Sequence, residues 1–353
     1  MNENDQSVHW RSLAEPLICW YQANHRPLPW RQSPTPYQTW ISEIMLQQTR
    51  VEAVKGYYSR FLTALPDVEA LANAEEEQLM KLWEGLGYYS RARNLQKCAR
   101  ILMEHHQGQL PADYHLLQSL PGIGPYTAGA IASIAFGLPV PAVDGNVLRV
   151  YSRCQADYRD ITLPETKKWV TTKLTEALES LPQGISGDFN QAVMELGATV
   201  CLPNGKPHCE ACPIAEFCAG RIKGCMLDLP VRGPKKGRRL EALTVLLIVR
   251  DGYFALRKRP EKGLLAGLWE LPNISGHLTG QALLEAIRAF GVEPLRIEPL
   301  GPARHIFTHV EWQMQGYRIT AETCSQKDML HWVGPEEKKR YALPSAFRYY
   351  LSE

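Results

Sequence analysis

Four cysteines fall within one short segment of the chain and could hold a metal centre. The segment reads CLPNGKPHCEACPIAEFC and contains Cys201, Cys209, Cys212 and Cys218. Four thiolates in one loop can surround a compact metal or metal–sulfur centre. Zinc is the competing interpretation, although zinc loops usually carry paired CxxC modules and this loop has one. A third interpretation is that these thiols only pack in the interior, as we expect of the cysteines at 19, 98, 154, 225 and 324.

A second motif, LPGIGPYTAGAI, places two glycines in a turn between helices. We expect a short helix over 113–119 and a longer one that starts at Pro125, because proline suits the first helical position. Gly122 and Gly124 are expected to adopt dihedrals that a Cβ would forbid. Their exposed amides and the positive end of the following helix could hold one anion, such as a DNA phosphate. The alternative is an ordinary connection without a ligand.

Two carboxylates lie in segments with helical spacing. Glu43 belongs to SPTPYQTWISEIMLQQTR, which predicts a helix with Thr35 as N-cap and Pro36 in the first position. The apolar face of that helix holds Trp40, Ile41, Ile44 and Met45. Glu43 lies away from this face, so periodicity alone predicts a solvated surface acid. Asp144 opens DGNVLRV and is, on the same grounds, a helix N-cap.

These side chains need a scaffold, and the sequence up to about residue 225 predicts a helical one. Apolar residues recur there every three or four positions, without persistent alternation. After Gly224, a basic stretch with Gly and Pro over 226–240 predicts a linker. ALTVLLIV, DG and YFALRKR then predict a hairpin, QALLEAIRAFG a helix closed by Gly291, and HIFTHVEWQMQGYRI a second hairpin. We therefore predict a helical domain over 1–225, the linker over 226–240 and an α+β domain over 241–353.

The composition restricts the function only weakly. A net charge of +2 does not indicate a nucleic-acid partner, although VRGPKKGRR concentrates basic residues. No segment has the ~18 uninterrupted apolar residues of a membrane span. The N-terminus, MNENDQSVHW, is polar and acidic, unlike a signal peptide. We expect a monomer in the cytoplasm or nucleoid of a bacterium, where thiols stay reduced and nine cysteines indicate a metal or cluster.

Taken together, these motifs resemble the MutY family of adenine-specific mismatch glycosylases, relatives of endonuclease III. ISEIMLQQT, VDGNVLRV, LPGIGPYTAGA and the cysteine loop match the family in order, and the resemblance covers nearly the whole chain. It implies an all-α helix-hairpin-helix glycosylase domain with a [4Fe–4S] loop over 201–218, followed by an α+β Nudix-like domain. The family usually has six residues between the first two cysteines. This chain has seven, Leu202 to His208, and the extra residue can bulge at Asn204 and Gly205.

The resemblance implies hydrolysis of the glycosidic bond of an adenine paired with 8-oxoguanine or guanine. Glu43 is implied to protonate adenine N7 and then to act as general base, with a pKa raised by burial. Asp144 is implied to stay ionised and to stabilise the oxocarbenium sugar, with Tyr126 and Asn146 assisting through hydrogen bonds. Endonuclease III-like enzymes that also cut the strand carry lysine at position 126. Tyrosine cannot form a Schiff base, so we expect a monofunctional glycosylase.

The implied partner is double-stranded DNA with the adenine flipped out of the stack. The implied adenine pocket consists of Arg26, Trp30, Arg31 and Gln191. The implied contacts with DNA or 8-oxoguanine are Gln48, Thr49, Leu86, Tyr88, Gly122, Gly124, Phe307, Thr308 and His309. Leu86 and Tyr88 are candidate wedges, with core packing as the alternative for Tyr88 and Tyr89. The family usually has serine at position 308, and threonine keeps the hydroxyl.

Three other functions stay open on the sequence alone. RKRPEKGLLAGLWELPN resembles the start of a Nudix fold, but the following helix carries only Glu285, which argues against Mg²⁺-dependent pyrophosphate hydrolysis. An endonuclease III-like glycosylase and lyase acting on oxidised pyrimidines is a second alternative, disfavoured by Tyr126. A non-catalytic iron–sulfur protein that binds DNA lesions is a third.

Overall fold

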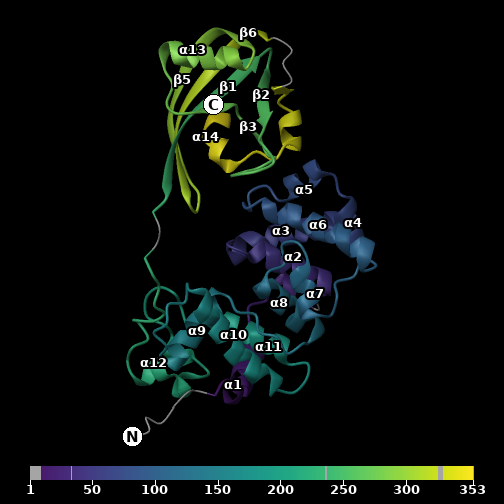
Figure 1. Cartoon of the computed structure of the whole chain (residues 1–353), viewed down its shortest axis with the longest axis vertical. Coiled ribbons are helices and arrows are strands. Elements are labelled where there is room, and N and C mark those ends of the chain that lie inside the picture. Colours follow the sequence, from purple (N-terminus) through teal and green to yellow (C-terminus); the bar gives the residue numbers. More distant parts are fainter. Residues whose placement is uncertain (1–8, 33, 235–236, 325–328, 353) are drawn as a thin grey trace. The chain divides into compact units, whose positions relative to one another are not determined.

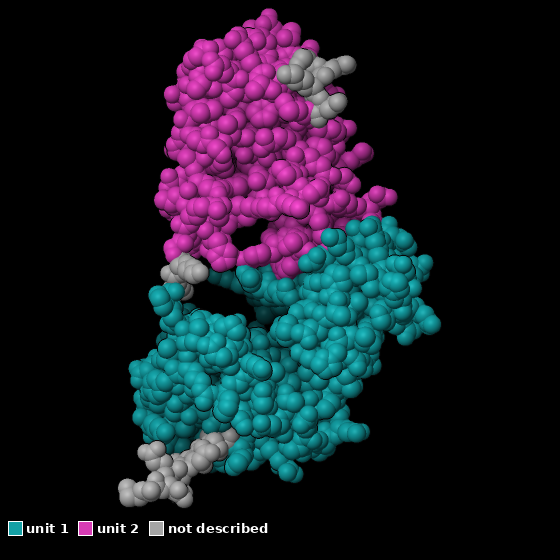
Figure 2. All heavy atoms as spheres, viewed as in Figure 1, with its two compact units in different colours: residues 1–73, 94–234 teal, residues 74–93, 235–353 magenta. Residues whose placement is uncertain are grey.

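The computed structural model describes residues 9–32, 34–234, 237–324 and 329–352. Its residues form two compact units (Figures 1 and 2): residues 1–73 and 94–234 make up unit 1, and residues 74–93 and 235–353 make up unit 2. The acidic N-terminal stretch up to Val8, and Lys235 and Lys236 of the expected linker, lie outside the described residues. The predicted domain boundaries stay predictions. No helix in the described ranges is both long enough and apolar enough to cross a membrane.

Unit 1 is helical (Figure 1). Its elements are α1 (Trp10–Asn24), η1 (Pro29–Arg31), α2 (Pro36–Leu46), α3 (Val51–Ala64), α4 (Val68–Asn73), most of α6 (Ser90–His105), α7 (Tyr114–Ser119), α8 (Pro125–Phe136), α9 (Gly145–Gln155), α10 (Pro164–Glu179), α11 (Ser186–Thr199), η2 (Cys209–Ala211), η3 (Ala215–Phe217) and α12 (Ala219–Ile222). This confirms the predicted all-α class for the first part of the chain.

The helices of unit 1 start where the sequence supplies capping groups. Thr35 caps α2, with Pro36 in the first position and Gln38 completing a capping box. Asp113 caps α7, and Asp144 caps α9. These positions confirm the predicted starts of the helices that carry the candidate acids and the glycine turn.

The turn between α7 and α8 differs from the expectation at one of its two glycines. Gly122 has φ of +77°, which favours glycine, but Gly124 has φ of −84° and is the N-cap of α8. The prediction that both glycines need special dihedrals is therefore wrong for Gly124. A Cβ there would meet open space, so backbone geometry does not require glycine at this position.

α8 lies at the centre of unit 1 and packs against both α2 and α11. Its residues from Thr127 to Ser133 are buried on every side, as expected for a helix without a solvent face. Small residues permit this close packing: a Cβ at Gly187 of α11 would lie 2.8 Å from the Ser133 carbonyl oxygen of α8. α11 also packs against α1 and α9. It therefore contacts the helices on which most of the candidate residues lie.

Unit 2 is built on a mixed sheet. Its elements are α5 (Glu76–Leu82), β1 (Arg239–Arg250), β2 (Tyr253–Lys258), β3 (Trp269–Glu270), β4 (Asn273–Ser275), α13 (Gly280–Ala289), β5 (Val292–Ile306), β6 (Val310–Cys324), β7 (His331–Val333), η4 (Glu337–Arg340), η5 (Ser345–Phe347) and α14 (Arg348–Leu351). The strand order is β3-β2-β1-β6-β5, with β4 also paired to β1 and β7 to β2. β1 and β6 are parallel, and the other pairs are antiparallel.

Both predicted hairpins are present in unit 2. Asp251 and Gly252 have φ of +50° and +82° between β1 and β2, as a two-residue hairpin turn requires. β5 and β6 form the second hairpin, whose tip contains Phe307, Thr308 and His309. α13 covers one face of the sheet through Leu283 and Ile287, and η5 and α14 pack on the other (Figure 1). The predicted α+β class is confirmed.

Candidate active site

Glu43 is buried, although its position on α2 predicted a surface acid. The residue is 6% exposed, and Tyr126 of α8 donates a hydrogen bond of 2.6 Å to its Oε2. Burial raises the pKa of Glu43 to about 7; the Tyr126 hydrogen bond opposes the rise, and the charge of Asp144 adds to it. The surface expectation fails because α8 covers the polar side of α2. Glu43 can therefore carry a transferable proton near neutral pH.

Tyr126 cannot act as an anion at this position. Burial raises the pKa of its phenol well above 10, and the charges of Glu43 and Asp144 raise it further. Its hydroxyl also lies 3.5 Å from the Met194 sulfur of α11. The phenol is thus fixed as a hydrogen-bond donor to Glu43.

Asp144 is held by the start of its own helix. Its Oδ1 accepts hydrogen bonds of 2.8 Å from the backbone amides of Asn146 and Val147, and its Oδ2 accepts one of 2.7 Å from Asn146 Nδ2. Burial raises the pKa of Asp144, and these hydrogen bonds and the charge of Arg149 oppose that rise. All three donors can only donate, so the cap is satisfied by the ionised carboxylate.

The buried Arg149 holds the Asn146 side chain of this cap in place. Arg149 of α9 donates to Asn146 Oδ1 at 2.9 Å, to the Gly197 carbonyl of α11 at 2.7 Å and to the Cys201 carbonyl at 2.8 Å. Gly197 permits the close approach, since a Cβ there would lie 2.6 Å from Asn146 Cβ. The orientation of Asn146, and through it Asp144, is therefore tied to α11 and to the cysteine loop.

Two residues of the expected adenine pocket, Arg26 and Arg31, share a partner that the sequence did not indicate. Glu195 of α11 is 1% exposed and accepts hydrogen bonds from both Arg26 and Arg31. Trp30 is buried with its ring edge-on to Tyr58. Gln191 accepts a hydrogen bond of 2.9 Å from Tyr21, another residue that the sequence did not indicate. A single acid within the apolar run AVMELGA was the available signal for Glu195.

The four cysteines line one small pocket, together with Arg153, Pro207 and Arg221. Arg153 Nη1 lies 3.3 Å from Cys201 Sγ. Among the described residues, no three His, Cys, Asp or Glu side chains converge closely enough to hold a single metal ion. Four cysteine thiols that line one pocket are the donor set that a [4Fe–4S] cluster takes. Gly205 adopts φ of +75°, as the expected turn at Asn204 and Gly205 requires.

Two of the predicted DNA contacts have a strained backbone. Gln48, which follows α2, and Tyr88, which precedes α6, have φ of +56° and +48°. Such conformations of non-glycine residues cost about 1–3 kcal/mol each and cluster at functional sites. Thr49 follows Gln48, and Gly122 and Gly124 are exposed in the turn before α8. Gln48, Thr49 and the glycine turn belong to unit 1, and Tyr88 belongs to unit 2.

Five residues expected to contact DNA or 8-oxoguanine lie together in unit 2. Leu86, Tyr88, Phe307, Thr308 and His309 all line one cavity of about 500 Å³. Tyr88 is 42% exposed, and its hydroxyl is hydrogen-bonded to that of Thr308. Phe307 packs edge-on against Trp312 at 4.9 Å. Leu86 is buried rather than exposed, so of the two candidate wedges only Tyr88 presents its ring at the surface.

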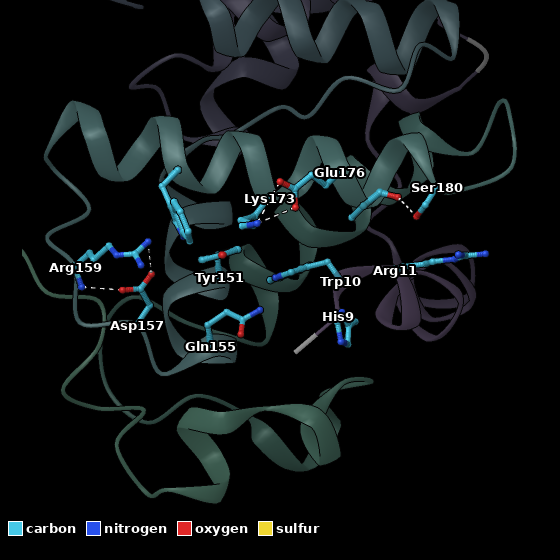
Figure 3. Close-up of a pocket in the computed structure, with 12 residues that line it drawn as sticks. His9, Trp10, Arg11, Tyr151, Gln155, Asp157, Arg159, Lys173, Glu176 and Ser180 are labelled. Atoms are coloured by element: carbon cyan, nitrogen blue, oxygen red, sulfur yellow. Dashed lines mark hydrogen bonds and ion pairs between the residues drawn. The ribbon is translucent and has the colours of Figure 1, made fainter. Parts of the chain in front are cut away.

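Unit 1 also contains a hollow of about 600 Å³ (Figure 3). Trp10 and Tyr151 stack along it with ring centroids 5.4 Å apart. Lys173 pairs with Glu176 at 2.9 Å, and Arg159 lies 3.7 Å from Asp157 (Figure 3). Among the described residues that line it, none is a predicted site residue.

Family models match both parts of the chain. Residues 41–179 match the model described as HhH-GPD superfamily base excision DNA repair protein. Residues 244–353 match the NUDIX domain model. The first range contains Glu43, Tyr126 and Asp144, and the second contains the hairpin tip at 307–309.

Individual relatives extend the match over most of the chain. The adenine DNA glycosylase of Rattus norvegicus is 35% identical, and the match covers 94% of this chain and 76% of the relative. That of Homo sapiens is also 35% identical, over 94% of this chain and 72% of the relative. The solved structure of a thermostable thymine-DNA glycosylase is 28% identical and has a TM-score of 0.55; the match covers 60% of this chain and 97% of that one. This chain therefore belongs to the adenine DNA glycosylase family and is a DNA glycosylase of base excision repair.

Proposed function

We propose that this enzyme removes adenine paired with 8-oxoguanine or guanine in double-stranded DNA by monofunctional hydrolysis of the glycosidic bond. The observation that carries the proposal is the buried pair of Glu43 and Tyr126, with the pKa of Glu43 raised to about 7. An acid that is protonated near neutral pH is what a purine leaving group needs. Adenine leaves a sugar poorly as an anion, and it leaves readily once a ring nitrogen has accepted a proton.

In the first step, Glu43 transfers its proton to N7 of the flipped adenine. The bond between N9 and C1′ then breaks, its electrons stay with the adenine, and C1′ is left as an oxocarbenium ion. Tyr126 donates to Glu43 Oε2 and keeps the carboxyl group oriented during the transfer. A positioned general acid of this kind accounts for about 10²–10⁴-fold of the rate.

Asp144 stabilises the cation that this step creates. Three hydrogen bonds hold its carboxylate at the start of α9 before the substrate arrives. Electrostatic stabilisation by a preorganised group needs no rearrangement while the reaction proceeds. Asn146 supplies two of those hydrogen bonds and is itself held by Arg149.

In the second step, a water molecule attacks C1′ and gives a proton to ionised Glu43, which regenerates the acid. The products are neutral adenine and an abasic sugar, so the sum is hydrolysis with one water consumed. Position 126 is tyrosine, and a phenol cannot form the imine through which a lysine cleaves the strand. The enzyme accordingly leaves the DNA backbone intact.

Other residues are assigned to extrusion of the base and to recognition of the opposite base. Flipping adenine costs a few kcal/mol of stacking, which Tyr88 offsets by entering the stack, with Leu86 behind it. Gln48 and Thr49 contact the opposite base, and the amides at Gly122 and Gly124 bind a phosphate without reading sequence. Phe307, Thr308 and His309 read 8-oxoguanine at the tip of the β5–β6 hairpin.

Cys201, Cys209, Cys212 and Cys218 are the residues that would hold a [4Fe–4S] cluster. When bound, the cluster supplies a rigid structural centre, and hydrolysis of a glycosidic bond needs no electron transfer. Two groups of residues connect the cysteine loop to the rest of the proposed site. Arg149 joins the Cys201 carbonyl to Asn146, and Lys206, Arg221 and Lys223 lie in or beside the loop as cations for the DNA backbone.

A single-turnover assay tests the proposal. Purified enzyme is mixed with duplexes that carry 8-oxoguanine:adenine, guanine:adenine or thymine glycol, and base release and strand cleavage are followed separately. We expect adenine release from the first two duplexes, with strand breaks only after alkali. Release of thymine glycol, or efficient cutting without alkali, would instead support an endonuclease III-like reaction.

A further inference from the structure

The carboxylate of Glu195 is completely occupied by two arginines. Oε1 accepts hydrogen bonds from Arg26 Nε at 2.7 Å and from the Arg26 backbone amide at 3.0 Å. Oε2 accepts from Arg26 Nη2 and Arg31 Nη2, both at 2.8 Å. Burial alone raises the pKa of Glu195, but these hydrogen bonds outweigh it and lower the pKa to about 2. Glu195 is therefore an anion throughout the working range of the enzyme.

This saturation decides what Glu195 can do. Four donors fill the acceptor sites of its two oxygens, so no acceptor is left for a substrate. The arginines, in contrast, keep donors to spare. Within the described residues, Arg26 Nη1 and Arg31 Nε have no hydrogen-bond partner, and the Arg26 side chain is 35% exposed. Among these three residues, any hydrogen bond to a flipped base must therefore come from the guanidinium groups.

Two neighbouring guanidinium groups are stable only if another group compensates their repulsion. Arg26 and Arg31 repel each other, and a carboxylate between them replaces that repulsion with two attractions. Tyr21 holds Arg31 from the other side, with the guanidinium carbon 5.3 Å from its ring centroid, and also donates to Gln191. These contacts connect five side chains into one row: Tyr21, Arg26, Arg31, Gln191 and Glu195. The row links η1, α1 and α11 along the expected adenine pocket.

We propose that Glu195 is a positioning residue that sets the spare guanidinium donors of Arg26 and Arg31 against the acceptor nitrogens of the flipped adenine. This inference rests on the proposed function, because it assigns the row to the same base pocket. N1, N3 and N7 of adenine are hydrogen-bond acceptors, so fixed cationic donors can bind them. Glu195 itself makes no contact with the base.

The same row also affects the catalytic acid. Glu43 is faced by Tyr126 from α8, by Asp144 from the start of α9 and by Arg31 from η1, and the charge of Arg31 lowers the pKa of Glu43. Neutralising Glu195 leaves the positive charge of Arg31 uncompensated. The ionised form of Glu43 is then favoured, its pKa falls, and base release should be lost at a lower pH than in the wild type.

Glu195→Gln is the direct test, because it keeps the size of the side chain and removes the charge. Glu195→Asp is the second variant: it keeps the charge and withdraws the carboxylate by one methylene. The matched control is Glu270→Gln in unit 2. Glu270 is also completely buried between two arginines, with Arg257 at 2.7 Å and Arg259 at 2.5 Å. It therefore reports the effect of losing such an anion away from the pocket.

Binding is measured on two duplexes that differ only in the presence of the base. One carries 2′-fluoro-2′-deoxyadenosine opposite guanine, whose fluorine resists cleavage because it destabilises the oxocarbenium ion. The other carries a tetrahydrofuran abasic analogue at the same position. Glu195→Gln should weaken binding to the first by about 10-fold or more and leave binding to the second unchanged. Glu195→Asp should also weaken binding only to the first duplex, but by a smaller factor.

The pH dependence of single-turnover adenine release gives the second readout. Its alkaline midpoint should move to lower pH in Glu195→Gln and stay at the wild-type position in Glu270→Gln. Equal weakening on both duplexes, or wild-type affinity and an unchanged midpoint in both Glu195 variants, would overturn the inference. If the wild-type enzyme itself releases no adenine, the proposed function fails instead, so the two failures can be told apart.

Discussion

Replacing Glu43 by glutamine should abolish base release and at the same time stabilise the protein at alkaline pH. Glutamine has nearly the same shape, and its amide oxygen can still accept the hydrogen bond from Tyr126. It has no proton to transfer, so catalysis is lost. It also has no charge to bury, so the free energy that the folded state loses by ionising Glu43 is recovered.

The size and sign of this stabilisation follow from the pKa. The pKa of Glu43 rises from its ordinary 4.5 to about 7 on folding, chiefly by burial. Between these two values the folded state holds a proton that the unfolded state has released, so the stability of the wild type falls as pH rises. Each pH unit is worth about 1.4 kcal/mol, which gives about 3 kcal/mol above pH 7. Below pH 4.5 both states are protonated and the effect vanishes.

Urea unfolding of both proteins at pH 5 and pH 8 measures the effect. Glu43→Gln should be more stable than the wild type by about 3 kcal/mol at pH 8 and by much less at pH 5. The exposed Glu179 of α10 provides the matched control, since Glu179→Gln changes the charge without changing burial. A Glu43→Gln protein with no stability gain at pH 8, or with an equal gain at both pH values, would refute a buried acid of raised pKa.

Three further predictions concern other parts of the site. Tyr126→Phe removes a hydrogen bond that lowers the pKa of Glu43. The alkaline limb of the pH–rate profile should therefore move to higher pH, and the rate of base release should fall about 10-fold or more. A shift of that limb to lower pH would contradict Tyr126 as the donor. Thr308→Ala should reduce the preference for 8-oxoguanine:adenine over guanine:adenine in single-turnover release, and an unchanged ratio would remove Thr308 from recognition. Cys212→Ser should lower the iron content and the visible absorbance of the purified protein and weaken duplex binding; full iron occupancy would exclude Cys212 as a ligand.

Local signals predicted the parts of the fold that local chemistry determines. Thr35 and Pro36 fix the start of α2, and Asp144 fixes the start of α9, because caps satisfy backbone amides within a few residues. Asp251 and Gly252 fix the first hairpin for a similar reason. These features depend on a few neighbouring residues, so a single sequence is enough to find them.

Features that depend on distant partners were not predictable in this way. Glu43 looked like a surface acid because periodicity describes one buried face of a helix, and α2 is buried on more than one side. Glu195 was missed because its partners, Arg26 and Arg31, are more than 160 residues away in the chain. The grouping of residues 74–93 with the C-terminal sheet left no signal in their composition either.

The roles proposed for the two acids follow from the donors that surround them. Both carboxyl groups are buried, and burial raises the pKa of both. Asp144 lies at a helix N-terminus, where two backbone amides and the Asn146 side chain donate to it and stabilise the anion. Glu43 lies inside α2, whose amides are already paired, and within the described part of the chain Tyr126 is its side-chain donor. A phenol alone does not offset the loss of hydration, so the pKa of Glu43 rises to about 7, whereas the donors around Asp144 oppose the rise of its pKa. The position of each acid in its helix therefore supports the proposed assignment, in which Glu43 protonates the purine and Asp144 stabilises the sugar.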